Sequence, residues 1–527
     1  MSFTELSEQE IIRRNSLNEL AKLGIEAYPA PEFQVNAHAA EIKERFDETA
    51  EPRNVVIAGR MMSRRIMGKA SFFELQDATG RIQVYVSRDD ISTDEASTAY
   101  NTVFKKLMDI GDIVGVKGFV FRTQTGEISV HAKELTMLSK SLRPLPIVKE
   151  KEGKVFDAFT DPEQRYRQRY LDLIVNPQVK EVFVKRTRMI NAIRNFFNSK
   201  GYLEVETPVL QAIPGGASAR PFITHHNALD IPLYLRIANE LYLKRLIVGG
   251  FDRVYEVGRI FRNEGMDPSH NPEFTSIEMY QAYTDYKGMM DLIEEMYRSL
   301  AKKICGKDVI SYQGTDIRLG EPWERLTMVE AVEKYAGVSY SDWATDADAR
   351  ACAKEHHVEV EEGEAATKGH VLIAFFDAFV EDKLIQPTII YDYPVENSPL
   401  AKRKPEDPAF TERFEYFIYA REMGNAFSEL NDPVDQKERF LKQVEARRAL
   451  GDTTGEVDED FVTALEYGLP PTGGLGLGLD RLVMLLTDSP SIRDVLLFPT
   501  MRPLSKQDGT EEEEDAEAAS DADATEV

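Results

Sequence analysis

The pattern of apolar and polar positions changes twice along the chain. Residues 7–23 place apolar side chains at helical intervals and end at Gly24, which predicts an amphipathic helix. From Asn54 the pattern changes to short runs rich in β-branched and aromatic residues, separated by turns that contain glycine. Five such runs within about 90 residues predict a small β-barrel, and the OB-fold is the common five-stranded form that binds nucleic acid. A structural β-domain without a ligand fits this pattern equally well.

A second and larger region begins near Asn176. Residues 179–200 have apolar positions at helical spacing, Gly201 ends this helix, and YLEVETPVL predicts a strand. Further along, a helical pattern gives way at residue 388 to β-type alternation that continues to residue 430. The expected organisation is an N-terminal helical extension (1–52), an OB-fold barrel (53–142), a linker (143–175), an α+β domain (176–505) with a helical insertion (327–385), and a tail (506–527).

The composition favours a cytoplasmic globular protein. Hydrophobic residues make up 42% and charged residues 29% of the 527 residues, which is typical of a chain with a sizeable core. No run approaches the roughly 18 apolar residues of a membrane span, and the polar start MSFTELSEQEIIRRN differs from a signal peptide. Two cysteines, Cys305 and Cys352, are too few for a disulfide framework or a cysteine-based zinc site.

The distribution of charge matters more than its total. The net charge of −26 by itself argues against a nucleic-acid partner. Ten acidic and no basic residues lie between Asp508 and Val527, which predicts a solvated tail without fixed structure. The barrel region 53–140 contains thirteen Lys/Arg and ten Asp/Glu, and a locally basic module remains compatible with a polyanionic partner.

The most informative stretch is a predicted hairpin between Val254 and Tyr283, whose two strands flank a loop rich in Gly, Pro and Asn. Strand alternation places one set of residues on one face of the two strands: Glu256, Gly258, Ile260, Arg262 and Glu264 on the first, and Phe274, Ser276, Glu278 and Tyr280 on the second. A face that combines an arginine, carboxylates and aromatic rings beside a loop histidine, His270, indicates a ligand site more than a structural surface.

A second predicted strand pair covers Arg413–Leu430. Its second strand carries three polar or aromatic residues on one face: Asn425, Phe427 and Glu429. Glu415 and Glu422 lie on either side of the predicted turn, and two carboxylates near bound phosphates suit Mg²⁺, which prefers oxygen ligands. An exposed acidic hairpin without a metal is the alternative interpretation.

The stretch Thr472–Asp488 combines a glycine-rich strand with a following helix. The glycines let a ligand approach the backbone closely, and Arg481 lies at the start of the helix, where free N–H groups and the helix dipole favour an anion. The glycine spacing is neither that of a dinucleotide-binding βαβ unit nor that of a P-loop. An anion site of a different type is therefore predicted.

Three of these segments resemble a known family. GYLEVETPVL, FRNEG with HNPEFT, and GLGLGLDR are similar to motifs 1, 2 and 3 of the class II aminoacyl-tRNA synthetases. With the barrel, NELYLKRL and GNAFSELND, the chain from about residue 10 to 504 resembles the lysyl-tRNA synthetase family. The resemblance implies an OB-fold that binds the anticodon of tRNA(Lys), a catalytic domain on a six-stranded antiparallel sheet, and a homodimer formed around motif 1.

The resemblance also implies roles for individual residues. Arg262 bridges the carboxylate of lysine and the α-phosphate of ATP, Arg481 holds the γ-phosphate, and Phe274 stacks on adenine. The other implied ATP-site residues are Glu264, His270 and Asn271, with Glu415 and Glu422 as ligands of Mg²⁺. The implied lysine site comprises Gly216, Glu240, Arg262, Glu278, Tyr280, Asn425, Phe427, Glu429 and Gly476. In the barrel, Phe72 is implied to stack on an anticodon base, with Gln83 and Glu127 contacting base edges.

Three alternatives remain at this point. A pure RNA-binding protein with a decayed synthetase domain is disfavoured, because the implied catalytic residues are all present. A relative that ligates an amino acid to a protein would lack the N-terminal barrel. An aspartate or asparagine enzyme is disfavoured, since an aspartate pocket needs cations where this sequence has Glu278 and Glu429. From the residues alone, the choice of Phe72 over its neighbour Phe73 as the exposed ring stays open.

Overall fold

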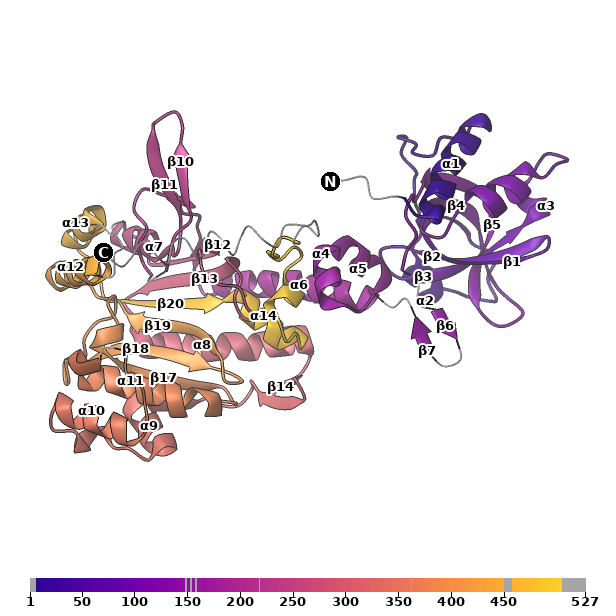
Figure 1. Ribbon diagram of the computed structural model, residues 1–527. Coiled ribbons are helices and arrows are strands. Elements are labelled where there is room, and N and C mark those ends of the chain that lie inside the picture. The colour runs from indigo at the N-terminus through magenta and orange to yellow at the C-terminus, as the bar shows by residue number, and fades with distance from the viewer. Residues whose placement is uncertain are drawn as a thin grey trace, which may run out of the picture. The chain divides into compact units, whose positions relative to one another are not determined.

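The computed structural model describes residues 6–146, 149–151, 154–156, 159–217, 219–361, 363–449 and 457–504 (Figure 1). The chain divides into two compact units, Met1–Thr160 and Asp161–Val527. The boundary falls inside the segment 143–175 that was predicted to be a linker. The acidic tail predicted for 506–527 lies outside the described residues. Among the described residues, no helix combines the length and apolar character that crossing a bilayer requires.

Unit 1 contains the predicted five-stranded barrel, closed in the order β1-β2-β3-β5-β4. The strands are β1 (Asn54–Met67), β2 (Ala70–Gln76), β3 (Arg81–Ser87), β4 (Ile113–Arg122) and β5 (Ile128–Ser139). Alternation decides which side chains fill the barrel: Phe73, Val84 and Val86 are buried, whereas Phe72 and Tyr85 are half-buried on the outside. The OB-fold prediction is therefore confirmed.

The N-terminal extension packs against the barrel. Helix α1 (Glu8–Lys22) begins at Ser7, whose side chain forms a capping box with Glu10, and Leu20 from this helix joins the barrel core. Ile42 from α2 (Ala39–Glu44) lies in the same apolar cluster. The remaining elements of unit 1 are α3 (Arg88–Ile91), the π-helical segment η1 (Ala99–Leu107), β6 (Lys149–Lys151) and β7 (Lys154–Phe156).

Unit 2 is built on one eight-stranded sheet, in the order β16-β17-β18-β19-β20-β13-β12-β8 (Figure 1). The strands are β8 (Leu203–Glu204), β12 (Arg253–Phe261), β13 (Glu273–Ala282), β16 (Glu324–Thr327), β17 (Thr388–Pro394), β18 (Phe410–Phe417), β19 (Glu422–Ser428) and β20 (Thr472–Gly478). The six central strands are antiparallel, as predicted. The two short edge strands, β8 and β16, pair in parallel and were not foreseen as additions to the sheet.

Strand alternation gives this sheet one apolar face and one polar face. Ile277, Met279, Leu475 and Leu477 are buried on the apolar face, which is covered by three helices. These helices are α6 (Pro177–Ser199), α8 (Tyr286–Leu300) and α14 (Leu479–Thr487). The intervening positions on β13 and β20 carry the carboxylate, aromatic and glycine residues of the predicted site. The core and the site are thus two sides of the same strands.

Two predictions need correction in unit 2. The strand predicted for YLEVETPVL is reduced to the two-residue strands β8 and β9 (Leu210–Gln211), because Leu203 and Glu204 pair with β12 whereas β9 pairs in a separate three-stranded sheet. Helices α4 (Pro162–Arg167) and α5 (Arg169–Val175), which fall in the predicted linker, belong to unit 2. These helices join unit 2 because Arg169 of α5 is buried there and donates a hydrogen bond of 3.2 Å to the carbonyl oxygen of Leu497.

The remaining elements surround the sheet. Between β9 and β12 the chain forms the hairpin β10 (Ile223–His226) with β11 (Ile231–Leu235) and then α7 (Glu240–Val248). The region predicted as a helical insertion contains α9 (Met328–Ala336), α10 (Asp346–Glu355), α11 (Lys368–Phe379) and the short turns η3 (Tyr340–Asp342), η4 (Gly363–Ala365) and η5 (Glu381–Lys383). The others are η2 (Ala301–Cys305), β14 (Val309–Tyr312), β15 (Thr315–Arg318), η6 (Val395–Asn397), α12 (Pro433–Ala449), α13 (Glu459–Glu466) and α15 (Ile492–Val495).

Candidate active site

Two cavities adjoin on the polar face of the sheet in unit 2. The larger has a volume of about 310 Å³ and the smaller about 280 Å³. Four residues line both cavities: Arg262, Glu278, Asn425 and Gly476. Almost all residues that the sequence placed in the lysine site or the ATP site line one of these two cavities. The sheet therefore presents two neighbouring binding spaces with a shared boundary.

Glycines on β20 create the space for the acidic side chains of β13. Gly476 pairs with Glu278 across the two strands, and a Cβ at position 476 would lie 2.7 Å from Glu278 Oε1. Gly474 pairs with Tyr280 in the same way, and a Cβ there would overlap Glu429 Oε1. Side chains at these two positions would fill the cavity floor. Close approach of carboxylates thus explains two glycines of this strand, Gly474 and Gly476.

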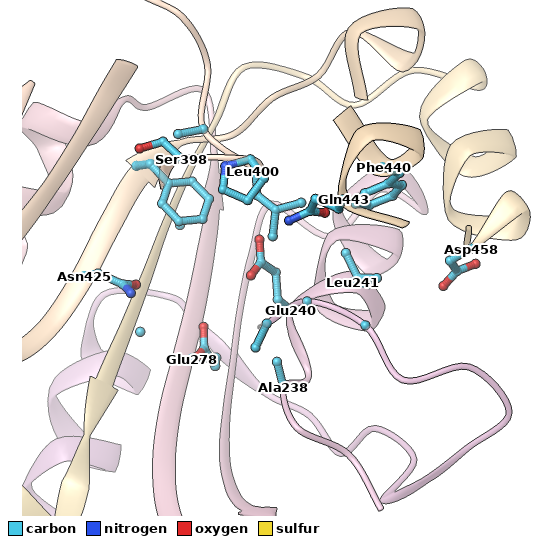
Figure 2. A pocket seen from close by; sticks show the side chains of 18 of the residues that line it. Ala238, Glu240, Leu241, Glu278, Ser398, Leu400, Asn425, Phe440, Gln443 and Asp458 are labelled. Carbon is cyan, nitrogen blue, oxygen red and sulfur yellow. The ribbon is translucent and has the colours of Figure 1, made fainter. Parts of the chain in front are cut away.

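Carboxylates from two elements point into the larger cavity. Figure 2 shows the side chains of Glu240, from the start of α7, and Glu278, from β13, directed toward the same space. The Tyr280 hydroxyl donates a hydrogen bond of 3.2 Å to Glu278 Oε2. Burial, followed by the negative charge of Glu240, raises the pKa of Glu278 to about 8. The cavity therefore gathers carboxyl groups whose ionised forms a cationic ligand would favour.

Glu429 lies beside this cavity and has a resident partner. Its side chain is fully buried, does not itself line the cavity, and forms an ion pair through Oε2 with the ammonium group of Lys244. Lys244, also fully buried, forms a second ion pair with Glu240 one helical turn earlier. Burial raises the pKa of Glu429 well above its usual value, an effect that the charge of Lys244 opposes and that of Glu240 reinforces. Lys244 was not among the residues predicted for the site.

Arg262 marks the boundary between the two cavities. It follows directly after β12, where its N–H donates a hydrogen bond of 2.8 Å to the carbonyl oxygen of Pro272 and so closes the motif 2 loop. Its guanidinium carbon lies 5.4 Å from the ring centroid of Phe274, which lines the smaller cavity. The buried Arg262 Nε has no hydrogen-bond partner among the described residues. The guanidinium group is thus placed to bind anionic groups from either cavity.

The smaller cavity is bounded by the motif 2 loop and the start of α14. Arg481 Nη1 donates a hydrogen bond of 2.5 Å to the carbonyl oxygen of Glu422, and Nη2 lies 3.2 Å from His270 Nε2. Glu264 is exposed and lines the cavity. Asn271 also lines it, but its side-chain amide donates a hydrogen bond of 2.6 Å to the carbonyl oxygen of Glu273. Asn271 therefore shapes the loop in addition to facing the cavity.

The two carboxylates predicted to bind a metal lie on neighbouring strands joined by a tight turn. Glu415 forms an ion pair of 2.5 Å with Arg413 and accepts a hydrogen bond of 3.0 Å from the hydroxyl of Tyr393. Burial raises the pKa of Glu415; the charge of Arg413 opposes this shift and that of Glu422 adds to it. Glu422 lines the smaller cavity. Within the described ranges no group of three or more metal-binding side chains occurs.

The remaining predicted residues of the lysine site complete the wall of the larger cavity. Asn425 and Phe427 project from β19 on the polar face of the sheet, and Gly216 lies opposite, with a φ of +85° that favours glycine. Phe427 also lies 5.3 Å, by ring centroid, from the ammonium nitrogen of Lys244. Of the nine residues predicted for the lysine site, Glu429 is the one that does not line this cavity directly.

The barrel carries a separate candidate surface. Phe72 is half-buried and Phe73 is buried, so the exposed ring of the pair is Phe72. Its centroid lies 5.2 Å from that of Tyr85. Tyr85 belongs to an aromatic cluster on the outside of the barrel that continues through Phe119, Phe121 and His131. These four residues were missed, although the alternation in RIQVYVS, GFVFR and EISVHAKEL places them on the outer face of the barrel.

The two polar residues predicted in the barrel lie near this cluster. Gln83 occupies the same face of β3 as Tyr85 and donates a hydrogen bond of 3.0 Å to Ser129 Oγ. Glu127 lies in the turn before β5 and forms an ion pair of 3.3 Å with Lys43 from α2. The structure thus brings Phe72, Gln83 and Glu127 to adjoining strands and turns of one domain.

Comparison with known proteins agrees with this architecture. Residues 161–502 match the sequence model of the class II tRNA synthetases (D, K and N). The chain belongs to this family. Residues 55–138 match the OB-fold nucleic acid binding domain. The two matches fall within units 2 and 1 respectively, and the class II match begins at the first residue of unit 2.

Similar proteins of this family are named lysine–tRNA ligase. One from Porphyromonas gingivalis strain W83 is 58% identical, over 95% of this chain and 87% of its own length. One from Moorella thermoacetica is 57% identical, over 93% of this chain and 97% of its own. One from Thermoanaerobacter strain X514 is 56% identical, over 95% of this chain and 97% of its own length. The similarity thus extends over both units of this class II synthetase, including the barrel.

Proposed function

We propose that the protein is a lysine–tRNA ligase, which activates L-lysine with ATP and transfers it to the 3′-terminal ribose of tRNA(Lys). The observation that carries the proposal is the pair of cavities that meet at Arg262, with carboxylates around the larger one. The names of the relatives support the same substrate. An aspartate-specific site would need positive charge where Glu278 stands.

In the first step, a carboxylate oxygen of lysine attacks the α-phosphorus of ATP, and pyrophosphate leaves. This reaction needs no nucleophile from the protein, so catalysis depends on positioning and on neutralising negative charge. Arg262 lies where the two cavities meet, and its planar fork can bind a carboxylate and a phosphate together. Arg481, at the start of α14, is the residue proposed for the γ-phosphate, with Phe274 against the adenine ring.

Selection of lysine depends on the carboxylates of the larger cavity. Glu240 lines the cavity and is the proposed partner of the α-ammonium group. The proposed partners of the side-chain ammonium group are Glu278, Tyr280 and Glu429. The space around them is shaped by Gly216, Asn425, Phe427 and Gly476. One ammonium–carboxylate pair at 4 Å contributes about 4 kcal/mol at an effective dielectric of 20, before desolvation is subtracted.

Glu415 and Glu422 are the residues proposed to hold Mg²⁺. The two carboxylates influence each other electrostatically, as the pKa of Glu415 indicates, and hard oxygen donors suit this ion. Mg²⁺ usually keeps only one or two protein carboxylates and takes further oxygens from substrate phosphates, which fits the pair seen here. When bound, the ion would neutralise charge on the phosphates of ATP. The motif 2 loop is proposed to enclose ATP in the same site, through Glu264, His270 and Asn271.

The barrel is proposed to bind the anticodon of tRNA(Lys). Single-stranded bases stack on exposed aromatic rings, and hydrogen bonds to base edges add selectivity. Phe72 and its aromatic neighbours are the candidates for stacking on bases. The candidates for hydrogen bonds to base edges are Gln83 and Glu127. In the second step, the terminal ribose hydroxyl of tRNA attacks the acyl carbon of lysyl-adenylate, and AMP leaves.

A homodimer in the cytoplasm is the proposed state of the protein. Support for a dimer comes from the motif 1 segment, where Leu203, Val209 and Leu210 expose 49%, 38% and 48% of their surface. Apolar side chains gathered in this way mark interaction surfaces. Light scattering coupled to size-exclusion chromatography tests this proposal, and a monomer at micromolar concentration contradicts it.

ATP–pyrophosphate exchange with each of the twenty amino acids, in the absence of tRNA, tests the proposed activity. We expect exchange with lysine alone. Ornithine, which is one methylene shorter, should be rejected only by about 10- to 200-fold, since one methylene contributes about 1–3 kcal/mol. Exchange with aspartate or asparagine would contradict the assignment of the pocket. Exchange with no amino acid would contradict the enzymatic function and leave the barrel as the functional part.

A further inference from the structure

The proposed mechanism leaves one buried charged residue of the site unused. Lys244 has 0% of its surface exposed, lies one turn after Glu240 on α7, and lines neither cavity. A buried ammonium group is costly unless it is paired. Lys244 has two partners, Glu240 on its own helix and Glu429 at the end of β19, 185 residues later in the chain. The structure therefore joins two proposed substrate-binding carboxylates through one internal cation.

The two oxygens of Glu429 differ in their surroundings. Oε2 pairs with the ammonium group of Lys244. Neither oxygen accepts a well-aligned hydrogen bond from the described residues, and Oε1 also lacks an ion-pair partner among them. It occupies the position that a side chain on Gly474 would take, and Gly474 is part of the cavity wall. A fully buried carboxylate oxygen without a donor, lying beside a glycine of the cavity wall, is positioned to accept a hydrogen bond from a ligand.

We propose that Lys244 is a positioning residue for substrate selection: its ammonium group holds Glu429 Oε2 and thereby leaves Oε1 for the side-chain ammonium group of lysine. The inference rests on the proposed function and deepens it. Lys244 does not contact the substrate in this arrangement and acts through Glu429. Without it, Glu429 would lose its only described ion-pair partner and could turn both oxygens toward any nearby donor.

Electrostatics support the same role. The charged groups that face Glu429 are Lys244 and Glu240 from α7 and Glu278 from β13, together with the hydroxyl of Tyr280. Among these groups only Lys244 is cationic, so it alone favours the ionised carboxylate that binds an ammonium group. The ring of Phe427, 5.3 Å from Lys244 Nζ, adds a further favourable contact for the cation.

The test uses four variants of the full-length protein in lysine-dependent ATP–pyrophosphate exchange: Lys244→Met, Lys244→Arg, Glu429→Gln and the double variant Lys244→Met/Glu429→Gln. We expect Lys244→Met to raise the KM for lysine by about 10- to 150-fold, the range for losing a hydrogen bond to a charged group. The KM for ATP should change by no more than about twofold. Lys244→Arg, which keeps the charge, should restore most of the affinity for lysine.

The double variant separates positioning from simple structural support. If Lys244 acts through Glu429, the double variant should bind lysine no more weakly than Glu429→Gln alone, because the group that Lys244 positions is already lost. Losses that multiply instead would overturn the proposal, as would an unchanged KM for lysine in Lys244→Met. The double variant also removes both charges of the pair, so it remains informative if Lys244→Met alone does not fold.

A matched control comes from Lys334→Met, which removes a lysine paired with Glu324 at 2.7 Å on the helical insertion, outside both cavities. It should leave both KM values unchanged. The wild-type protein distinguishes the two levels of inference. No exchange with lysine in the wild type would reject the proposed function, whereas normal wild-type exchange with an unaffected Lys244→Met variant rejects only the role of Lys244.

Discussion

The Tyr280 hydroxyl donates a hydrogen bond of 3.2 Å to Glu278 Oε2. The two residues lie two positions apart on the same face of β13. Tyr280 has only 2% of its surface exposed, so its hydroxyl group is held firmly against the carboxyl group. With a pKa raised to about 8 by burial and by Glu240, Glu278 is protonated at neutral pH in the free protein. This pairing leads to a prediction about pH.

Binding of lysine should release a proton from Glu278. An ammonium group beside this residue favours the ionised form, so the KM for lysine should fall as pH rises toward about 8, by up to about tenfold per pH unit. In Glu278→Gln this dependence should be absent, although affinity is lower overall. The measurement is the KM for lysine in pyrophosphate exchange between about pH 6.5 and 8.5. An equal pH slope in the variant would contradict the assignment.

The same raised pKa has a consequence for stability. Between the ordinary pKa of a glutamate and about 8, the folded state keeps the proton that the unfolded state has lost. The free energy of unfolding should therefore decrease as pH rises through this interval, and Glu278→Gln should show a smaller decrease. Denaturant unfolding at several pH values measures this slope. A slope that is identical in both proteins would indicate that Glu278 is ionised in the free state.

Gly474→Ala should weaken lysine binding without affecting ATP. The added Cβ would overlap Glu429 Oε1 and lie 2.6 Å from Tyr280 Cε1, so the carboxylate must move. We expect the KM for lysine to rise by at least about tenfold, as for loss of a hydrogen bond to a charged group. Gly478→Ala, on the same strand, is the control, because its Cβ would make only ordinary contacts of 3.7 Å. Equal effects of the two substitutions would argue against a specific role of Gly474.

Arg262→Lys should impair the chemical step strongly. A lysine ammonium group cannot form the bidentate contacts of a guanidinium group, and it would leave the junction of the two cavities incompletely neutralised. We expect kcat/KM in exchange to fall by about 10²-fold or more. Arg259→Lys, three residues earlier on β12, is the matched control, since the Arg259 side chain is 47% exposed and forms an ion pair of 3.6 Å with Glu273. Comparable losses in both variants would refute the assignment of Arg262.

We expect Phe72→Ala to weaken tRNA binding and Phe73→Ala to lower the stability of the barrel. Removing the half-buried Phe72 ring should raise the KM for tRNA by about 5- to 150-fold, the range for one stacked base, while pyrophosphate exchange stays unchanged. Phe73 has 1% of its surface exposed, so its truncation should instead destabilise the barrel by about 3–5 kcal/mol. Aminoacylation kinetics and thermal unfolding separate the two. Normal tRNA charging by Phe72→Ala would remove this ring from the proposed RNA surface.

Much of the site could be predicted because strand alternation is a local property. The faces of β13, β19 and β20 follow from sequence period alone, and the structure confirms them. Strand alternation also predicted that Glu256 faces the binding site from β12. In the structure this carboxylate is buried and forms an ion pair of 2.7 Å with Arg236. The segment that covers Glu256 is separated from it in sequence, and its path depends on tertiary packing that no local pattern reveals.

Lys244 was missed for a similar reason. Its helix has an ordinary amphipathic pattern, and a lysine four residues after a glutamate is common on exposed helices. Only the packing of α7 against the end of β19 turns this pair into a buried site. The edge strand at Leu203 and the helices around Arg169 differ from prediction because partners distant in the chain decide whether a segment joins a sheet or a core.

Leu475 and Leu477 face the helices, whereas Gly474 and Gly476 line the larger cavity, so β20 cannot gain or lose a single residue without exchanging its two faces. Inserting one amino acid in this strand would turn leucines into the cavity and glycines into the core, so folding and ligand binding would fail together. Strands of this sheet can therefore vary during evolution only by replacement of residues in place. New amino-acid preferences on this scaffold must come from such replacements, or from insertions in the loops and helices outside the strands.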